Sequence, residues 1–149
     1  MSLRIKSNIH KAGWGLLCAC MAILSGLFFA WIKSLLGADT GNAESINQQV
    51  NVNLAYLLMP LLISPVIEEW IFRKSLPDLL QEKLPKLAAI VLSNILFAIL
   101  HGDWFIFPYF VNGCLYAYSY ERTGDLKVPV FSHMLYNAFV FATTFLFSA

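Results

Sequence analysis

Long apolar stretches alternate with shorter polar segments along this chain. Five stretches are expected to form helices, at residues 12–36, 54–75, 86–101, 104–120 and 128–149. A helix needs about 20 apolar residues to cross the hydrocarbon core of a bilayer, which is about 30 Å thick. The pattern therefore predicts an all-α integral membrane protein, with about five transmembrane helices in a single membrane domain over residues 1–149.

The third and fourth stretches are short, and a polar connection separates them. Gly102 and Asp103 follow the third stretch, and Pro108 interrupts the fourth. The apolar run 87–100 reaches about 21 Å as a helix, less than the thickness of the core. Non-helical backbone at membrane depth is tolerated where it is buried in protein or lines a wet cavity. We therefore expect a short broken hairpin around His101–Pro108 and a site near His101.

Composition supports a membrane protein and excludes several other classes. Hydrophobic residues make up 58% of the chain and charged residues 13%, whereas a soluble domain is about half apolar and about a quarter charged. The mean hydropathy is +0.65. These values argue against a disordered chain and an ordinary soluble domain, and they predict the lipid bilayer as a partner. The net charge of +1 provides no field for nucleic acid.

The distribution of lysine and arginine predicts the orientation. Basic residues lie in the N-terminal tail, in segment 73–86 and in turn 121–127, while the polar loop 37–53 and the 102–103 connection contain none. Basic segments tend to remain in the cytoplasm. We therefore expect a multi-pass protein of the cell membrane with its N-terminus in the cytoplasm and its C-terminus outside.

Small and aromatic residues suggest how the helices pack and where they meet the membrane surface. Small residues recur every three or four positions in the first stretch, which predicts a packing face and a possible homo-oligomer: Gly15, Ala19, Ala22, Gly26 and Ala30. Several aromatic residues are expected mostly near the membrane interfaces, as anchors: Trp14, Trp104, Tyr109, Tyr116, Tyr118 and Tyr120.

Ionisable side chains inside apolar stretches are costly in lipid and indicate function by default. Glu69 and Arg73 are four residues apart, in the favourable order for a helical ion pair, and Arg73 can fork to the carboxylate. Glu68 lies about 100° around the helix and need not share this partner. A free carboxylate in apolar surroundings suits a general base. The alternative is that both acids are solvated at the cytoplasmic end of the span.

Two further motifs place histidines on other stretches. Phe97 lies one turn before His101, on the same helix face, and can buttress its ring. His133 and Asn137 are four residues apart, so they share a face and can offer polar groups to one point. The plainer alternatives are a histidine at a helix end in the headgroup region and a polar stripe that joins helices.

If these motifs converge, they suggest a site that activates water. Glu68 can accept a proton from the water, and His101 can orient it. His133 and Asn137 can donate hydrogen bonds to the oxyanion that forms when a peptide carbonyl is attacked. No cofactor is needed for this chemistry.

In their order and spacing, the motifs resemble those of the CPBP intramembrane proteases. This group is also called the Abi or CAAX-protease-like family and includes the Rce1-type prenyl-protein endopeptidases. The resemblance extends over about residues 64–137 and rests on E-E-x-x-x-R at 68–73, F-x-x-x-H at 97–101 and H-x-x-x-N at 133–137.

The resemblance implies a helical membrane fold with its site in a cavity among the spans, and an intramembrane endopeptidase of the glutamic type. Glu68 and His101 would activate the water, and His133 and Asn137 would stabilise the oxyanion. Glu69 and Arg73 would support the site, together with Phe97. The chain has only about five expected spans, fewer than many members of the family, so we expect a small peptide or a membrane-anchored protein as substrate in preference to a prenylated protein.

Three alternatives remain open at this stage. Two histidines and a carboxylate can hold zinc with an open coordination position, and the set would be Glu68, His101 and His133. The chain could instead be a non-catalytic membrane scaffold or immunity protein that retains the motifs as structure. It could also be a small proton- or metal-coupled carrier that uses the same buried groups.

Overall fold

The computed structural model describes residues 3–37 and 57–147, and every regular element within these ranges is a helix. The predicted all-α class is therefore confirmed. The predicted loop 37–53 lies outside the described residues except for Gly37. The elements, in chain order, are α1 (Leu3–Leu35), η2 (Met59–Ile63), α3 (Ser64–Glu69), η3 (Trp70–Ser75), α4 (Leu76–Gln81), α5 (Lys86–Leu100), α6 (Phe107–Thr123) and α7 (Lys127–Phe147).

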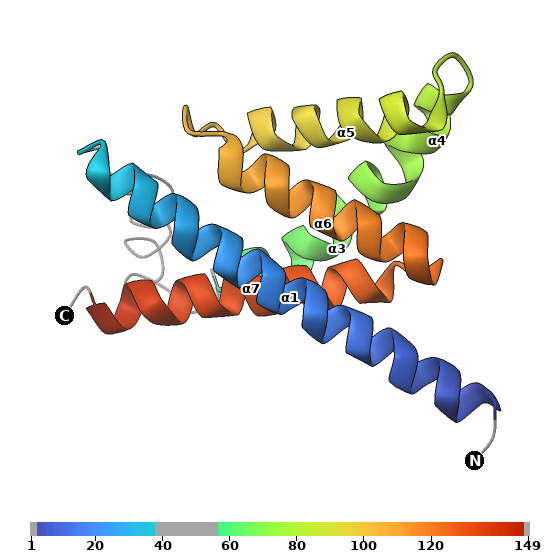
Figure 1. The fold of residues 1–149 in the computed structure, drawn as a ribbon, viewed down its shortest axis with the longest axis horizontal. Coiled ribbons are helices and arrows are strands. Elements are labelled where there is room, and N and C mark those ends of the chain that lie inside the picture. The colour runs from blue at the N-terminus through green and yellow to red at the C-terminus, as the bar shows by residue number, and fades with distance from the viewer. Residues whose placement is uncertain (1–2, 38–56, 148–149) are drawn as a thin grey trace.

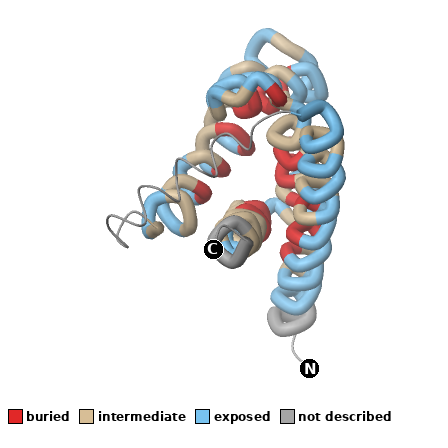
Figure 2. Tube along the Cα trace, turned by 90° about the vertical axis from the view of Figure 1, so that its left-hand side faces the viewer, coloured by how far each residue is buried: buried red, intermediate tan, exposed pale blue. Residues whose placement is uncertain are grey.

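Helix α1 runs diagonally across α7 in Figure 1 and packs against both α6 and α7. Helix α6 also packs against α5, and α5 packs against α4. Buried residues lie on the faces that the helices turn toward one another, and exposed residues lie on the outer faces (Figure 2). A small buried cluster of Cys18, Ala22 and Tyr116 joins α1 to α6. Helices α1, α6 and α7 thus pack together on one side of the molecule.

The small-residue face of α1 packs against α7 of the same chain. A Cβ atom added to Gly15 would lie 3.0 Å from the Phe131 ring, and one added to Gly26 would lie 2.8 Å from the Tyr136 ring. Ala19 and Ala22 are buried. These residues allow α1 to approach α7 closely, as the predicted packing face requires. A homo-oligomer formed through the same face would have to displace α7.

Helix bounds differ from expectation at three places. The first helix begins at Leu3 instead of residue 12. The second stretch continues to Gln81 instead of ending at residue 75, and the fourth covers Phe107–Thr123 instead of 104–120. Pro77 lies in the first turn of α4, where its missing N–H is tolerated. The chain reverses between α5 and α6, where residues 101–106 are not helical and Gly102 has a φ of 68°.

Two π-helical segments, η2 and η3, flank α3, and each is followed by a proline. In η2 the Ser64 N–H donates to the Met59 carbonyl, five residues earlier. The next bond of this kind would join Pro65 to the Pro60 carbonyl, but proline has no N–H. The side-chain amide of Asn137 in α7 donates to this carbonyl at 2.8 Å. The hydrogen bond from Asn137 to the Pro60 carbonyl thus joins η2 to α7.

The same arrangement occurs at η3. The Leu76 N–H donates to the Ile71 carbonyl, and the next bond would join Pro77 to the Phe72 carbonyl. Since Pro77 has no N–H, the Phe72 carbonyl accepts a hydrogen bond from Ser93 Oγ in α5 at 2.7 Å. Two prolines therefore create acceptors that polar side chains of α7 and α5 satisfy. These bonds hold the segment that carries Glu68, Glu69 and Arg73 between the two helices.

In the part of the chain that the structure describes, one helix is long and apolar enough to cross a membrane, at Ser7–Leu35, and Lys86–Leu100 is a shorter apolar helix. Large apolar side chains are exposed on the outer faces of several helices, among them Leu24, Trp31, Val66, Leu87 and Leu100. Such surfaces are typical of contact with lipid or another protein.

Candidate active site

A buried ion pair forms the base of the candidate site. Glu69 and Arg73 are 0% and 3% exposed, and Arg73 Nε lies 2.8 Å from Glu69 Oε2. The predicted ion pair is therefore confirmed. The predicted fork is wrong, because Arg73 Nη1 donates to Asn94 Oδ1 on α5 and not to the second oxygen of Glu69. The guanidinium also lies over the Phe97 ring, 4.6 Å from its centroid.

The second oxygen of Glu69 binds His133 from α7. His133 Nδ1 lies 2.8 Å from Glu69 Oε1. Arg73 stabilises the ionised carboxylate, so this oxygen accepts and Nδ1 carries the hydrogen. The other ring nitrogen, Nε2, lies 3.9 Å from Glu68 Oε2. This distance is too long for a direct hydrogen bond, but a water molecule can bridge it.

Glu68 lies at the less buried edge of this network, with 26% of its side chain exposed. Ser64 Oγ, one helical turn earlier, donates to Glu68 Oε1. Glu68 Oε2 is buried and has no hydrogen-bond partner among the described residues. One carboxylate is thus locked by a guanidinium and an imidazole, while its neighbour retains an oxygen available for hydrogen bonding. This division matches the expectation of one structural and one free carboxylate.

His101 follows the last residue of α5 and is held by its own helix. Its Nδ1 lies 2.8 Å from the Phe97 carbonyl oxygen, and the two rings meet edge to face with centroids 4.6 Å apart. The predicted buttress by Phe97 is confirmed. Tyr109 stacks on His101 at 4.2 Å between centroids. The Phe97 ring also lies edge to face with the His133 ring, with centroids 6.1 Å apart, so His101 and His133 lie against the same ring.

Asn137 and His133 bind different groups in the structure, and their shared role at an oxyanion stays a prediction. His133 binds Glu69, whereas Asn137 Nδ2 donates to the backbone carbonyl of Pro60. The difference arises because Pro65 leaves that carbonyl without its helical donor. An asparagine amide carries two N–H groups, so one hydrogen remains beyond the bond to Pro60.

Sequence reasoning missed three residues of this network. Asn94 is 1% exposed and is the second acceptor for Arg73; a polar residue inside the apolar stretch 86–101 was the signal that could have identified it. Ser64 binds Glu68 and lies four residues before it. Tyr116 was expected near an interface, but it is 1% exposed and stacks on His133 at 4.9 Å.

Within residues 3–37 and 57–147, no group of three or more His, Cys, Asp or Glu side chains is arranged to hold a metal ion. Zinc binding by Glu68, His101 and His133 stays an untested alternative.

Comparison with known proteins places these motifs in a family. A family model described as type II CAAX prenyl endopeptidase Rce1-like matches residues 50–139. The chain belongs to this Rce1-like family. The matched range contains Glu68, His101, His133 and Asn137, so the resemblance found from the motifs is confirmed at the level of the family.

Two curated relatives of this Rce1-like chain carry peptidase names. It is 30% identical over 106 residues to "Putative membrane peptidase YdiL" of Bacillus subtilis, which covers 70% of this chain and 43% of the relative. It is 34% identical over 86 residues to "Membrane-embedded CAAX protease MroQ" of Staphylococcus aureus, which covers 53% of this chain and 35% of the relative. No solved structure matches the chain. The chain thus spans less than half the length of these relatives.

Proposed function

We propose that this Rce1-like chain is a membrane endopeptidase of the glutamic type, acting on a small peptide or a membrane-anchored protein. The observation that carries the proposal is the pair of facing atoms on Glu68 and His133. Glu68 Oε2 has no hydrogen-bond partner among the described residues and lies 3.9 Å from His133 Nε2. A water between these atoms would be held beside a carboxylate that can accept its proton. The names of both relatives agree with peptidase activity.

In the proposed reaction, Glu68 accepts a proton from the water as its oxygen attacks the peptide carbonyl carbon. His101 orients the water. The carbonyl π electrons move to the oxygen, and His133 and the second amide hydrogen of Asn137 stabilise this oxyanion. Collapse of the intermediate breaks the C–N bond, and Glu68 returns the proton to the leaving amine. Glu69 and Arg73 orient His133, and Phe97 supports the His101 ring.

Donation by His133 requires a particular protonation state. Its Nδ1 already bonds to Glu69 at 2.8 Å, so Nε2 can donate to an oxyanion when the ring is protonated. The hydrogen bond to Glu69 orients the ring so that Nε2 faces Glu68 and the space beside it.

We also propose the membrane setting for this chemistry. Five helical spans carry the site within the cell membrane, with the N-terminus in the cytoplasm and the C-terminus outside. The apolar helix Ser7–Leu35, the exposed apolar side chains and the membrane proteins among the relatives support this placement. The proposed reaction requires no metal or other cofactor.

A cleavage assay with the full chain in liposomes tests the proposal. The panel contains short peptides, tagged membrane-segment substrates and a prenylated CAAX peptide, each with and without chelator. Wild type should cleave at least one substrate in chelator, whereas Glu68→Gln should not. Glu82→Gln is the control, because Glu82 is exposed and lies well beyond Glu68 in the sequence. Equal cleavage by Glu68→Gln would contradict the proposal. Inactivity of wild type on the whole panel would favour a scaffold, and transport dependent on an ion gradient would favour a carrier.

A further inference from the structure

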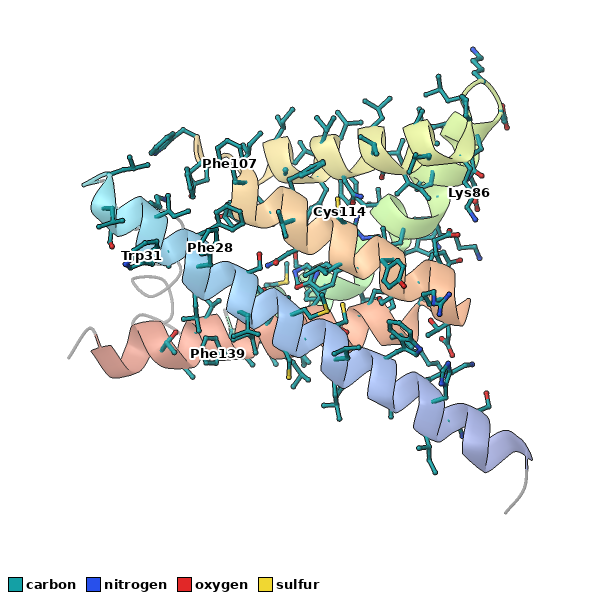
Figure 3. All side chains as sticks on the ribbon, in the orientation of Figure 1. Phe28, Trp31, Lys86, Phe107, Cys114 and Phe139 are labelled. Atoms are coloured by element: carbon teal, nitrogen blue, oxygen red, sulfur yellow. The ribbon has the colours of Figure 1, made fainter. Side chains whose placement is uncertain are left out.

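The end of α1 is tied to the connection that follows His101. Lys33 Nζ of α1 lies 2.9 Å from Asp103 Oδ2, with 13% and 9% of the two side chains exposed. The other oxygen, Asp103 Oδ1, accepts the Phe105 N–H at 3.0 Å. Apolar contacts reinforce the attachment, because Phe29 packs against both Phe105 and Phe107. Figure 3 labels Phe107 beside the part of α1 that carries Phe28.

The same carboxylate reaches the candidate site through Tyr109. Tyr109 Oη donates a long hydrogen bond of 3.4 Å to Asp103 Oδ2. The Tyr109 ring stacks on His101 with centroids 4.2 Å apart and planes 30° apart. The imidazole therefore has the Phe97 ring edge to face on one side and the Tyr109 ring stacked on it. A continuous series of contacts runs from Lys33 to His101.

His101 needs such support because its own helix ends there. Helix α5 ends at Leu100, and the positive φ of Gly102 turns the chain immediately after His101. The helix can hold the ring through one hydrogen bond to Phe97. A second contact from α6 limits rotation of the ring about its side-chain bonds. Catalysis is sensitive to displacements of about 1 Å in such groups.

We propose that Tyr109 is a positioning residue for His101, and that the Lys33–Asp103 ion pair holds Tyr109 in place. The inference rests on the proposed function for its catalytic consequence, but the geometry of the ring can be tested separately. Lys33 lies outside the matched range 50–139. Helix α1 would thus contribute to the site from beyond the part of the chain that the family match covers.

The chain offers a matched control at the opposite end of α1. Lys11 Nζ of α1 lies 3.0 Å from Asp125 Oδ2, and Asp125 Oδ1 accepts the Lys127 N–H at 3.0 Å. Like Lys33–Asp103, this ion pair joins a lysine of α1 to an aspartate in a connection between two other helices. The hydrogen bonds of Asp125 join α1 to the connection between α6 and α7. Asp125→Asn therefore removes a similar but more exposed ion pair, with 35% and 27% of its side chains exposed, without affecting Tyr109.

The position of the ring can be measured by NMR without any activity assay. The chain contains three histidines, so ¹³C-histidine labelling gives three imidazole signals, and His101→Ala identifies one of them. The stacked Tyr109 ring should shift the His101 signal upfield through its ring current. Tyr109→Leu should abolish this shift. Tyr109→Phe keeps the ring but lacks the hydroxyl that binds Asp103, so it should reduce the shift as Asp103→Asn does. Asp125→Asn should leave it unchanged. An unchanged His101 signal in Tyr109→Leu would overturn the proposal.

Kinetics then test the consequence for catalysis. Tyr109→Leu and Asp103→Asn should lower kcat by about tenfold, within the loss of about 10²-fold that a misplacement of about 1 Å can cause, with little change in KM. Tyr109→Phe keeps the stacked ring and should therefore retain more of the wild-type kcat than Tyr109→Leu. A loss in Asp125→Asn equal to that in Asp103→Asn would show a general structural effect and contradict positioning. If wild type cleaves no substrate, the proposed function fails, while the NMR comparison still decides whether Tyr109 positions His101.

Discussion

His133 Nδ1 lies 2.8 Å from Glu69 Oε1, so a histidine of α7 and a glutamate of α3 share a buried hydrogen bond. Arg73 binds the other oxygen of the same carboxylate. The hydrogen bond between His133 and Glu69 fixes the hydrogen of His133 on Nδ1 and turns Nε2 toward Glu68. Of the two adjacent glutamates, the first can thus take part in chemistry while the second orients the histidine. The predictions below test this division and the packing that supports it.

Glu69→Gln should destabilise the fold strongly. The substitution leaves the Arg73 guanidinium buried without its counter-charge, and breaking a buried ion pair in this way costs about 3–5 kcal/mol. Chemical unfolding in mixed micelles measures the loss. Glu82→Gln, at an exposed position, should change the free energy of unfolding by less than about 0.5 kcal/mol. Equal stability of the two variants would show that Glu69 does not carry a buried charge.

Ser93→Ala and Asn137→Ala should each destabilise the π-helical segments. Each removes the donor to a carbonyl that a proline has deprived of its helical partner, Phe72 in one case and Pro60 in the other. Phe72 is buried, and leaving its carbonyl unsatisfied should cost about 1–3 kcal/mol. Pro60 is only partly buried, so the loss in Asn137→Ala should be smaller. Thr143→Ala is the comparison, because the Thr143 hydroxyl donates to carbonyls of its own helix. The same unfolding measurement should rank it as the mildest of the three, and a reversed order would contradict the account of the prolines.

Gly113→Ala should disturb the network through α6. A Cβ atom at this position would lie 3.0 Å from Asn94 Oδ1 and 3.2 Å from the Phe97 ring. Because Asn94 accepts from Arg73, the strain reaches the buried ion pair, with an expected loss of about 1–3 kcal/mol. Gly13→Ala meets nothing within 4 Å and should stabilise helix α1 by up to about 1 kcal/mol. Thermal unfolding of the two variants should therefore shift in opposite directions.

The Lys33–Asp103 ion pair should make stability depend on pH. Partial burial acts to raise the pKa of Asp103, but the Phe105 N–H and the Lys33 ammonium outweigh it, so the pKa lies below its ordinary value. A carboxyl with a lowered native pKa stabilises the fold above its unfolded pKa of about 3.9, and this stability is lost as the pH falls through the native pKa. The Tm difference between wild type and Asp103→Asn should therefore shrink between pH 5 and pH 2. A constant difference would exclude this linkage.

The sequence predicted contacts within a helix better than contacts between helices. Glu69 and Arg73, or Phe97 and His101, meet because a fixed rise and turn per residue place them on one face. Arg73 and Glu69 bind partners on other helices, Asn94 and His133. These contacts depend on how α5 packs against η3 and α7 against α3, and helix periodicity carries no information about this. Asn94 was missed for that reason.

Asn137 and Tyr116 show two further reasons for the differences. Asn137 was expected beside His133, but the π-helical segment before Pro65 exposes a carbonyl that it satisfies. Local sequence does not specify a π turn in advance, because such turns are rare. Tyr116 was expected at an interface because tyrosine is common there. Its ring stacks on His133 instead, and this tertiary contact overrides the general preference.

The most direct test of the central claim is single-turnover cleavage by Glu68→Gln in comparison with wild type, at equal unfolding temperature and in chelator. The glutamine keeps the shape of the side chain and its bond to Ser64 but cannot accept a proton from water. Loss of a general base lowers the rate by about 10²–10⁴-fold, and we expect a loss in this range without a change in substrate binding. A Glu68→Gln variant that cleaves at the wild-type rate would contradict the account.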